Sequence, residues 1–217
     1  MDYKETEMSN AKNIFSTYGT PLHYEIGQMV MEKGAAAKQI WYIQSGIVRA
    51  YCTNSEGVEI TLLFVGPGKI IGLESFASGS TFFNYGDAAT PIDALSLPAE
   101  TFLEIWQDCK YPLVEFIEQF TQKIFSLQDI ICCSHYRDGN QKVAYFLYSQ
   151  SHQSGPYIPY SNDQIAALTG INRVSVNRIL NTFSKNGMIA LGYRKIQVLK
   201  PDELKKVFNS VGYLIRD

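Results

Sequence analysis

The segment from Ser161 to Met188 constrains the fold of this 217-residue chain most, because it predicts two short helices joined by a tight turn. Ser161 and Gln164 have the spacing of a capping box, so a helix is expected to begin near residue 162. Gly170 stands where the chain must reverse, and glycine enters the left-handed backbone region without strain. Asn172 can cap a second helix, whose apolar residues repeat at helical spacing at Val176, Ile179, Leu180 and Phe183. The segment therefore predicts a helix-turn-helix.

The other side chains of the second helix are expected to face outward, and their chemistry suits nucleic acid. Arginine can bond guanine in a fork or hold a phosphate, asparagine can pair with adenine, and valine can pack on a thymine methyl group. An ordinary helical hairpin with a solvated polar face is the alternative. The residues expected to contact DNA here are Asn172, Arg173, Val174, Ser175, Asn177 and Arg178.

The residues after the second helix predict a wing. Two short apolar-rich runs, 188–191 and 195–199, flank Gly192 and fit a two-stranded hairpin, to which residues 157–160 could add a third strand. Arg194 and Lys195 lie near its tip and are expected to approach the sugar-phosphate backbone. The alternative is that these are ordinary exposed charges without a specific partner, as is common on a wing.

Charge is distributed unevenly along the chain, although the net charge is only −2. Residues 1–136 contain 8 Lys and Arg against 16 Asp and Glu, giving −8, and residues 137–217 contain 11 against 5, giving +6. Only the C-terminal part is therefore suited to a polyanion. No apolar run approaches the roughly 18 residues that span a membrane, and the N-terminus lacks a secretory pattern, so we expect a cytoplasmic protein without membrane contact.

Cysteine and histidine give no sign of a metal or catalytic site. Cys52, Cys109, Cys132 and Cys133 do not have disulfide-framework or zinc-ligand spacing, and the neighbouring pair Cys132 and Cys133 is better explained by packing than by redox chemistry. The three histidines are far apart in sequence. A barrel enzyme of the cupin type would need clustered metal ligands, so we expect neither a metal nor enzymatic activity.

The N-terminal part reads as a β-barrel followed by a long helix. Short β-type runs at 39–43, 47–52, 59–65, 70–72 and 92–97 alternate with turn residues, which predicts a sandwich or jelly-roll. After Pro112, apolar residues follow a heptad pattern, which predicts that this helix packs against the same helix of a second copy of the chain. The alternative is a wide apolar face that is buried within a monomer. The seam residues are Leu113, Ile117, Phe120, Ile124, Leu127 and Ile131.

This order of elements, with several short motifs, resembles the Crp-Fnr family of bacterial transcription regulators over nearly the whole chain. The motifs are 32–34 (EKG), 41–46 (WYIQSG), 54–57 (NSEG), 66–72 (GPGKIIG) and above all 171–180 (INRVSVNRIL). The resemblance implies an α+β fold with an N-terminal jelly-roll (cupin-like) barrel at 1–111, a dimerisation helix at 112–136 and a winged helix-turn-helix at 137–217. It also assigns Arg173, Val174, Asn177 and Arg178 to the recognition surface.

The sequence around Gly72 and Glu74 departs from the pattern of cyclic-AMP-binding members of that family. Those members carry a Gly-Glu pair followed some ten residues later by an arginine for the phosphate, whereas here Leu73 separates Gly72 from Glu74 and no arginine lies between Arg49 and Arg137. A bound phosphate would lack a cation to offset its desolvation. Cyclic AMP is therefore disfavoured. An iron–sulfur cluster is also disfavoured because no cysteine precedes Cys52, and nothing recommends haem.

A pocket for a small apolar or aromatic effector remains, although each aromatic residue in it is better explained as barrel core. The candidate pocket residues are Tyr51, Phe64, Gly72, Leu73, Glu74, Ser75, Phe83, Asn84 and Tyr85. We thus expect a homodimeric regulator that binds a palindromic operator on double-stranded DNA, senses an unidentified effector and, as an activator, would contact RNA polymerase. The alternative is an effector-independent or thiol-responsive DNA binder whose barrel only supports dimerisation.

Overall fold

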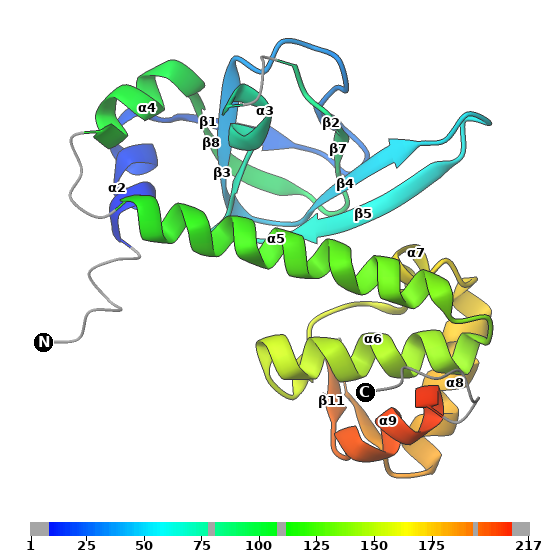
Figure 1. Ribbon diagram of the computed structural model, residues 1–217. Coiled ribbons are helices and arrows are strands. Elements are labelled where there is room, and N and C mark those ends of the chain that lie inside the picture. The colour runs from blue at the N-terminus through cyan, green and yellow to red at the C-terminus, as the bar shows by residue number, and fades with distance from the viewer. Residues whose placement is uncertain (1–8, 78–80, 108–111, 193–194, 210–217) are drawn as a thin grey trace, which may run out of the picture. The chain divides into compact units, whose positions relative to one another are not determined.

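The computed structural model describes residues 9–77, 81–107, 112–192 and 195–209. The chain forms two compact units, Met1–Ile124 and Phe125–Asp217. The division falls inside one long helix, α5 (Pro112–His135), which is continuous in Figure 1. The first half of α5 thus belongs to the N-terminal unit and the second half to the C-terminal unit.

The N-terminal unit contains two antiparallel four-stranded sheets that enclose a shared core. One has the order β1-β8-β3-β6, with β1 (Thr20–Tyr24), β8 (Ile92–Pro98), β3 (Gln39–Ser45) and β6 (Ile70–Ile71). The other has the order β2-β7-β4-β5, with β2 (Met29–Met31), β7 (Tyr85–Ala88), β4 (Val48–Thr53) and β5 (Glu59–Val65). Their inward side chains meet in one cluster that includes Met31, Trp41, Val48 and Val65. The predicted jelly-roll architecture is confirmed.

The sheet containing β3 is buried on both faces. Trp41 and Ile43 point into the core between the sheets, whereas Ile40 and Tyr42 point to the other side. There they pack with two helices that the sequence patterns did not predict, α2 (Ser9–Tyr18) and α4 (Ala99–Gln107), and with Leu73 of the short helix α3 (Leu73–Ala77). This second cluster anchors the segment that precedes Glu74.

Gly46 closes the turn between β3 and β4 and offers a test of barrel packing. Its φ is 82°, and a Cβ there would lie 2.1 Å from the carbonyl oxygen of Pro91. Backbone strain and steric overlap should together lower the free energy of unfolding of Gly46→Ala by about 2–5 kcal/mol. Gly57→Ala is the matched control, because Gly57 has a φ of 78° and an added Cβ would meet nothing within 4 Å. Urea titration of both variants measures the difference, and equal losses would contradict the packing argument.

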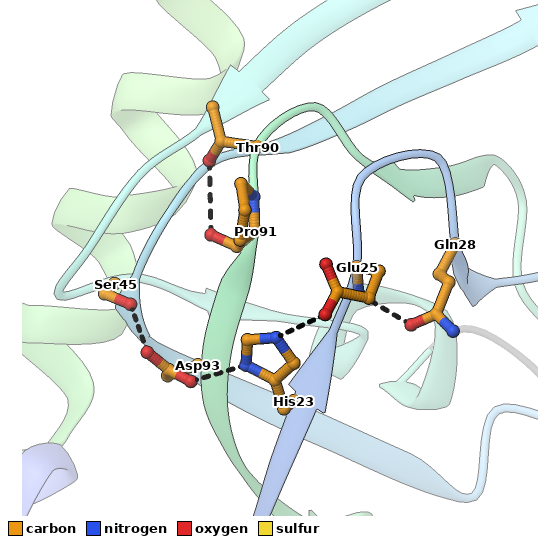
Figure 2. A network of polar contacts seen from close by, with 7 residues as sticks. All are labelled: His23, Glu25, Gln28, Ser45, Thr90, Pro91 and Asp93. Carbon is orange, nitrogen blue, oxygen red and sulfur yellow. Dashed lines mark hydrogen bonds and ion pairs between the residues drawn. The ribbon is translucent and has the colours of Figure 1, made fainter.

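An exposed polar network joins β1, β3 and β8 (Figure 2). Nδ1 of His23 lies 2.8 Å from Oδ1 of Asp93, and the Ser45 hydroxyl donates to the other oxygen of Asp93 at 2.8 Å. The hydrogen bond to Asp93 raises the pKa of His23 above its usual 6.5, and the same bond lowers the pKa of Asp93. The pair therefore stabilises the fold below the pKa of an unfolded histidine and above that of an unfolded aspartate, and the effect is lost outside that window. Asp93 stands between a hydroxyl and an imidazole, which is not the order of a nucleophile and its base.

The C-terminal unit is a winged helix-turn-helix, as the sequence predicts. It contains α6 (Gly139–Ser154), α7 (Asn162–Thr169), α8 (Arg173–Lys185) and α9 (Pro201–Asn209), and a small sheet of order β10-β11-β9. The strands are β9 (Tyr157–Ile158), β10 (Ile189–Gly192) and β11 (Lys195–Val198). A buried carboxylate, that of Asp129, fixes the end of α5 to α6 by accepting hydrogen bonds from Ser149, Gln150 and Gln153.

The described residues contain neither a membrane-spanning helix nor a cluster of metal ligands. None of their helices combines the length and the apolar character that crossing a bilayer requires. Within the same residues, no three His, Cys, Asp or Glu side chains gather as metal ligands would.

Candidate nucleic-acid interface

Local capping positions α7 and α8. The Ser161 backbone N–H donates to Oε1 of Gln164 at 2.8 Å, and the Gln164 N–H donates to the Ser161 hydroxyl at 3.2 Å, which completes the capping box. Gly170 ends α7 in the left-handed conformation, with φ 67° and ψ 27°. The side chain of Asn172 accepts the N–H of Ser175 at 2.8 Å and so caps α8. These contacts are the ones that the sequence predicts, and they define where α8 begins.

The two faces of α8 separate cleanly. Its inner face is buried in the C-terminal unit by the four expected residues Val176, Ile179, Leu180 and Phe183. On the opposite face Val174 is 79% exposed, the largest value among the exposed large hydrophobic residues of the described chain. Asn172, Arg173, Asn177 and Arg178 are also exposed, and Ser175 is half-buried. The exposed Val174 can make an apolar contact with a partner, beside Arg173 and one turn before Arg178.

Two recognition residues have partners on α7 that sequence reasoning missed. Nε of Arg173 lies 3.2 Å from Oδ1 of Asp163, and Nδ2 of Asn162 donates to Oδ1 of Asn177 at 3.1 Å. The only sequence signal was that Asn162 and Asp163 are polar residues in the first turn of α7. Their contacts depend on how the two helices cross, which spacing along one helix does not reveal.

The wing is formed by the predicted hairpin. Gly192 pairs with Lys195, and Lys195 is exposed at the start of β11. The predicted third strand is β9, which pairs with β11 through Tyr157 and Ile158. Arg194, the other expected backbone contact, lies outside the described residues.

Helix α5 carries an exposed apolar stripe. Ile117, Ile124 and Ile131 recur every seven residues and are 52%, 60% and 60% exposed. Phe120 and Leu127 of the expected seam are half-buried, and the side chain of Leu113 lies outside the described part. Exposed isoleucines at heptad spacing are typical of a helix that packs against a second helix.

The candidate sensor segment, residues 72–75, contacts α5 within the N-terminal unit. Nζ of Lys123 lies 3.1 Å from both carboxylate oxygens of Glu74 and also donates to the Ile70 carbonyl at 3.4 Å. Leu73 and Ser75 are buried, and Gly72 adopts a φ of 92°. Lys123 of α5 thus supplies the positive charge that pairs with the Glu74 carboxylate. The barrel sequence after Arg49 contains no arginine that could do so.

The aromatic candidates do not line the core between the two sheets. Tyr51 and Tyr85 stack at 5.2 Å between ring centroids beside Arg49, which also holds Asp87, on the face of the sheet opposite the core cluster. Phe64 alternates with Leu63 and Val65, which face the core, so it too lies on that opposite face. Phe83 is exposed and Asn84 is half-buried. Residues 72–75 contact α5 through Glu74 and form the candidate sensor segment, and the assignment of the other residues to an effector pocket stays a prediction.

The thiol of Cys133 is poorly suited to redox sensing. Cys133 is 1% exposed, and burial raises the pKa of its thiol to about 12. At pH 8 its thiolate fraction is then roughly a thousandth of that of a free cysteine with a pKa of about 8.5. Iodoacetamide should accordingly alkylate Cys133 about a thousandfold more slowly in the folded protein than after denaturation. Peptide mass spectrometry measures both rates, and comparable labelling would restore the thiol-sensing alternative.

Comparisons with known proteins agree with this arrangement. Residues 21–109 match a family model described as a cyclic nucleotide-binding domain, and residues 141–207 match a Crp-like helix-turn-helix domain. The cyclic AMP receptor protein of Thermus thermophilus is 24% identical over 187 residues, which cover 85% of this chain and 86% of that protein. A global nitrogen regulator of Synechocystis sp. is 23% identical over 96% of this chain and 100% of its own length. The structure of FixK2 from Bradyrhizobium japonicum has the same fold, with a TM-score of 0.71 at 17% identity over 89% of this chain and 99% of that one.

Proposed function

This chain belongs to the Crp-Fnr family of transcription regulators, and from that premise we propose that it is a homodimer whose two copies of α8 read a palindromic operator under the control of its barrel. The observation that carries the proposal is the exposed face of α8, where Val174 projects between Arg173 and Arg178. Relatives of the chain are regulators rather than enzymes, as the sequence predicts.

Charge supports DNA as the partner. The net charge of +6 over residues 137–217 contrasts with −8 before them, so the field of the C-terminal unit attracts a duplex although the whole chain is acidic. Arg178 can form a guanine fork or a phosphate contact, and Lys195 on the wing can approach the backbone. Together these groups provide both positioning and base readout.

Dimerisation would proceed through α5. The isoleucine stripe has the seven-residue period of a two-stranded coiled coil, and a two-fold dimer would place two copies of α8 at half-sites about 34 Å apart. A single recognition helix reads few base pairs, so pairing supplies the specificity that a genome demands.

The sensor would act through the contact between α5 and residues 69–75. Besides the Lys123–Glu74 pair, Oε1 of Gln119 accepts the Ile70 N–H at 3.1 Å, and Oε1 of Gln122 accepts from Nζ of Lys69 at 2.7 Å. An effector bound beside this segment would change these contacts and thereby favour one arrangement of α5 over another. The absence of an arginine after Arg49 in the barrel still argues against a cyclic phosphate as that effector.

Selection of binding sites from random duplex DNA tests the proposed function. We expect a palindromic consensus with half-sites one helical turn apart. The logarithm of operator affinity should fall linearly with the logarithm of salt concentration, with a slope of about 0.9 per neutralised phosphate. A salt-independent interaction, or no enrichment over scrambled competitor, would exclude the proposal.

Val174 gives a sharper expectation about operator sequence. Many Crp-Fnr members carry glutamate at this position, where it accepts a hydrogen bond from a cytosine amine, and valine cannot do so. We expect an A·T pair at the contacted step, with valine against the thymine methyl group, and Val174→Glu should shift the preference to G·C by about 5- to 150-fold. Competition between two operators that differ only at this step measures the shift. A conserved G·C pair in the operator of the unaltered protein would refute the valine contact.

The alternative of a thiol-responsive regulator has less support. The burial of Cys133 and the elevated pKa of its thiol oppose thiolate formation there. Operator binding that is insensitive to reductant but sensitive to fractions of cell extract would favour a small-molecule effector over both thiol control and constitutive binding.

A further inference from the structure

We infer that the first turn of α7 decides which hydrogen-bonding atoms α8 presents to the base pairs, so that two residues outside the recognition helix set operator specificity. The inference rests on the proposed function, because it concerns the same DNA-reading surface. It assigns roles to Asn162 and Asp163, which are adjacent in sequence and each contact one side chain of α8.

Asn162 holds one end of the Asn177 amide. An asparagine that reads adenine uses its oxygen to accept from N6 and its nitrogen to donate to N7. In this structure Oδ1 of Asn177 already accepts from Nδ2 of Asn162 at 3.1 Å, so the group left for a base is the NH₂ donor. A donor matches thymine O4, adenine N7, or guanine O6 and N7, and it repels the amine of cytosine. Asn177 is thereby expected to favour bases that present acceptors in the major groove.

Asp163 positions Arg173 in a complementary way. Its Oδ1 contacts Nε of Arg173 at 3.2 Å, and within the described part of the chain this contact leaves both terminal Nη groups of the guanidinium available to form a fork. Two parallel Nη donors match O6 and N7 of guanine. The side chains of Arg173 and Asp163 are 70% and 64% exposed, so this pair contributes little to folding stability. A carboxylate in the first turn of a helix also interacts favourably with the helix dipole, and here it engages the arginine as well.

Asn162→Asp tests the asparagine contact with a nearly isosteric change. A carboxylate accepts hydrogen bonds only, so Asn177 must turn its NH₂ group inward and present Oδ1 instead. The preference at the base pair that faces Asn177 should then move toward the bases that present an amine, cytosine above all and adenine, by about fivefold or more in the ratio of affinities. Competition among four operators that differ at that pair measures the ratio. An unchanged preference at every base pair would overturn the role of Asn162.

The added negative charge needs its own control, because it weakens binding to any duplex. Asn186→Asp makes the same charge change at an exposed residue that ends α8. It should lower affinity for all four operators together and leave their ratios unchanged. If Asn186→Asp shifts the ratios as much as Asn162→Asp does, the effect is general electrostatics and the inference fails.

Asp163→Asn tests the arginine contact, because affinity and specificity should move in opposite directions. Removing the carboxylate should strengthen binding to a scrambled duplex a few-fold, since less negative charge faces the phosphates. Discrimination between guanine and other bases at the Arg173 position should fall by about fivefold, because the fork is no longer held. Equal strengthening for operator and scrambled DNA would show that Asp163 acts only by repulsion and would overturn its positioning role.

The outcomes for the unaltered protein separate this inference from the proposed function. If the unaltered chain selects no operator, the proposed function fails before the variants are compared. If it selects one and neither variant changes the ratios, the function stands and the inference alone fails. Thermal melts of both variants should match the unaltered protein closely, because the substituted contacts are exposed.

Discussion

Replacing Ile117 and Ile124 together by glutamate should convert the protein from a dimer to a monomer and lower operator affinity about a thousandfold. Both side chains are more than half exposed on α5, so the double variant should remain folded. In a coiled-coil seam, however, each glutamate would face apolar groups and a like charge from the second copy. The double variant is therefore expected to keep the fold of each chain and to lose the dimer.

The thousandfold estimate follows from linked binding. A half-site bound at roughly micromolar strength gains from its tethered partner an effective concentration in the millimolar range, and the ratio of these quantities is about 10³. Sedimentation equilibrium should report a fall from twice to once the chain mass of 24.5 kDa, and fluorescence anisotropy should report the loss of operator binding.

A matched variant excludes a general effect of new charge. Ile26, in the turn between β1 and β2, is 66% exposed and does not belong to α5, so Ile26→Glu should change neither mass nor affinity. An unchanged dimer mass for the α5 double variant would mean that another surface joins the copies. A monomeric mass for the unaltered protein would remove the basis of the dimer proposal.

The parts of the fold that the sequence predicted are those specified by local interactions. The capping box at Ser161 and the left-handed Gly170 operate within four residues, so the boundaries of α7 could be read directly. Strand β5 was expected at 59–65 and occupies Glu59–Val65, because turn residues bracket a run of β-formers. In these segments, neighbouring residues already determine the backbone.

Helix α6 was missed for a physical reason. Its buried residues include Gln141, Val143, Ala144, Phe146 and Leu147, which cover much of the circumference of the helix instead of one stripe. A helix surrounded by α7, α8, α9 and β9 has no polar face to reveal a period, so its pattern resembles that of a buried strand. Only the tertiary environment resolves such a segment.

The candidate sensor residues show a second limit. Alternation places Arg49 and Tyr51 on one face of β4 and Val48 and Ala50 on the other, but alternation does not say which face encloses the core. Here the aromatic pair lies with the arginine, opposite the core, and is covered by the guanidinium. The contact between Lys123 and Glu74 joins residues 49 positions apart in the sequence, and no sequence motif predicted it. Long-range contacts of this kind decide the site and leave no local pattern.

Arg178→Ala should weaken operator binding by about 2–6 kcal/mol per dimer, or roughly 30-fold to 10⁴-fold. One arginine contact is worth about 1–3 kcal/mol, and a two-fold complex loses it twice. Arg178 is exposed and, unlike Arg173, forms no ion pair within the described residues, so its guanidinium needs no rearrangement to engage DNA. Fluorescence anisotropy at fixed salt measures the loss.

Two further variants identify what Arg178 contacts and exclude a general charge effect. Arg178→Lys keeps the charge but not the fork, so it should retain most affinity at a phosphate and lose most at guanine. If the contact is to phosphate, Arg178→Ala should also reduce the salt slope by about one per half-site. Lys206→Ala removes one positive charge from an exposed residue that pairs with Glu203, and it should have little effect. Equal losses for Arg178→Ala and Lys206→Ala would mean that α8 contributes only diffuse charge, and base readout by this helix would then be excluded.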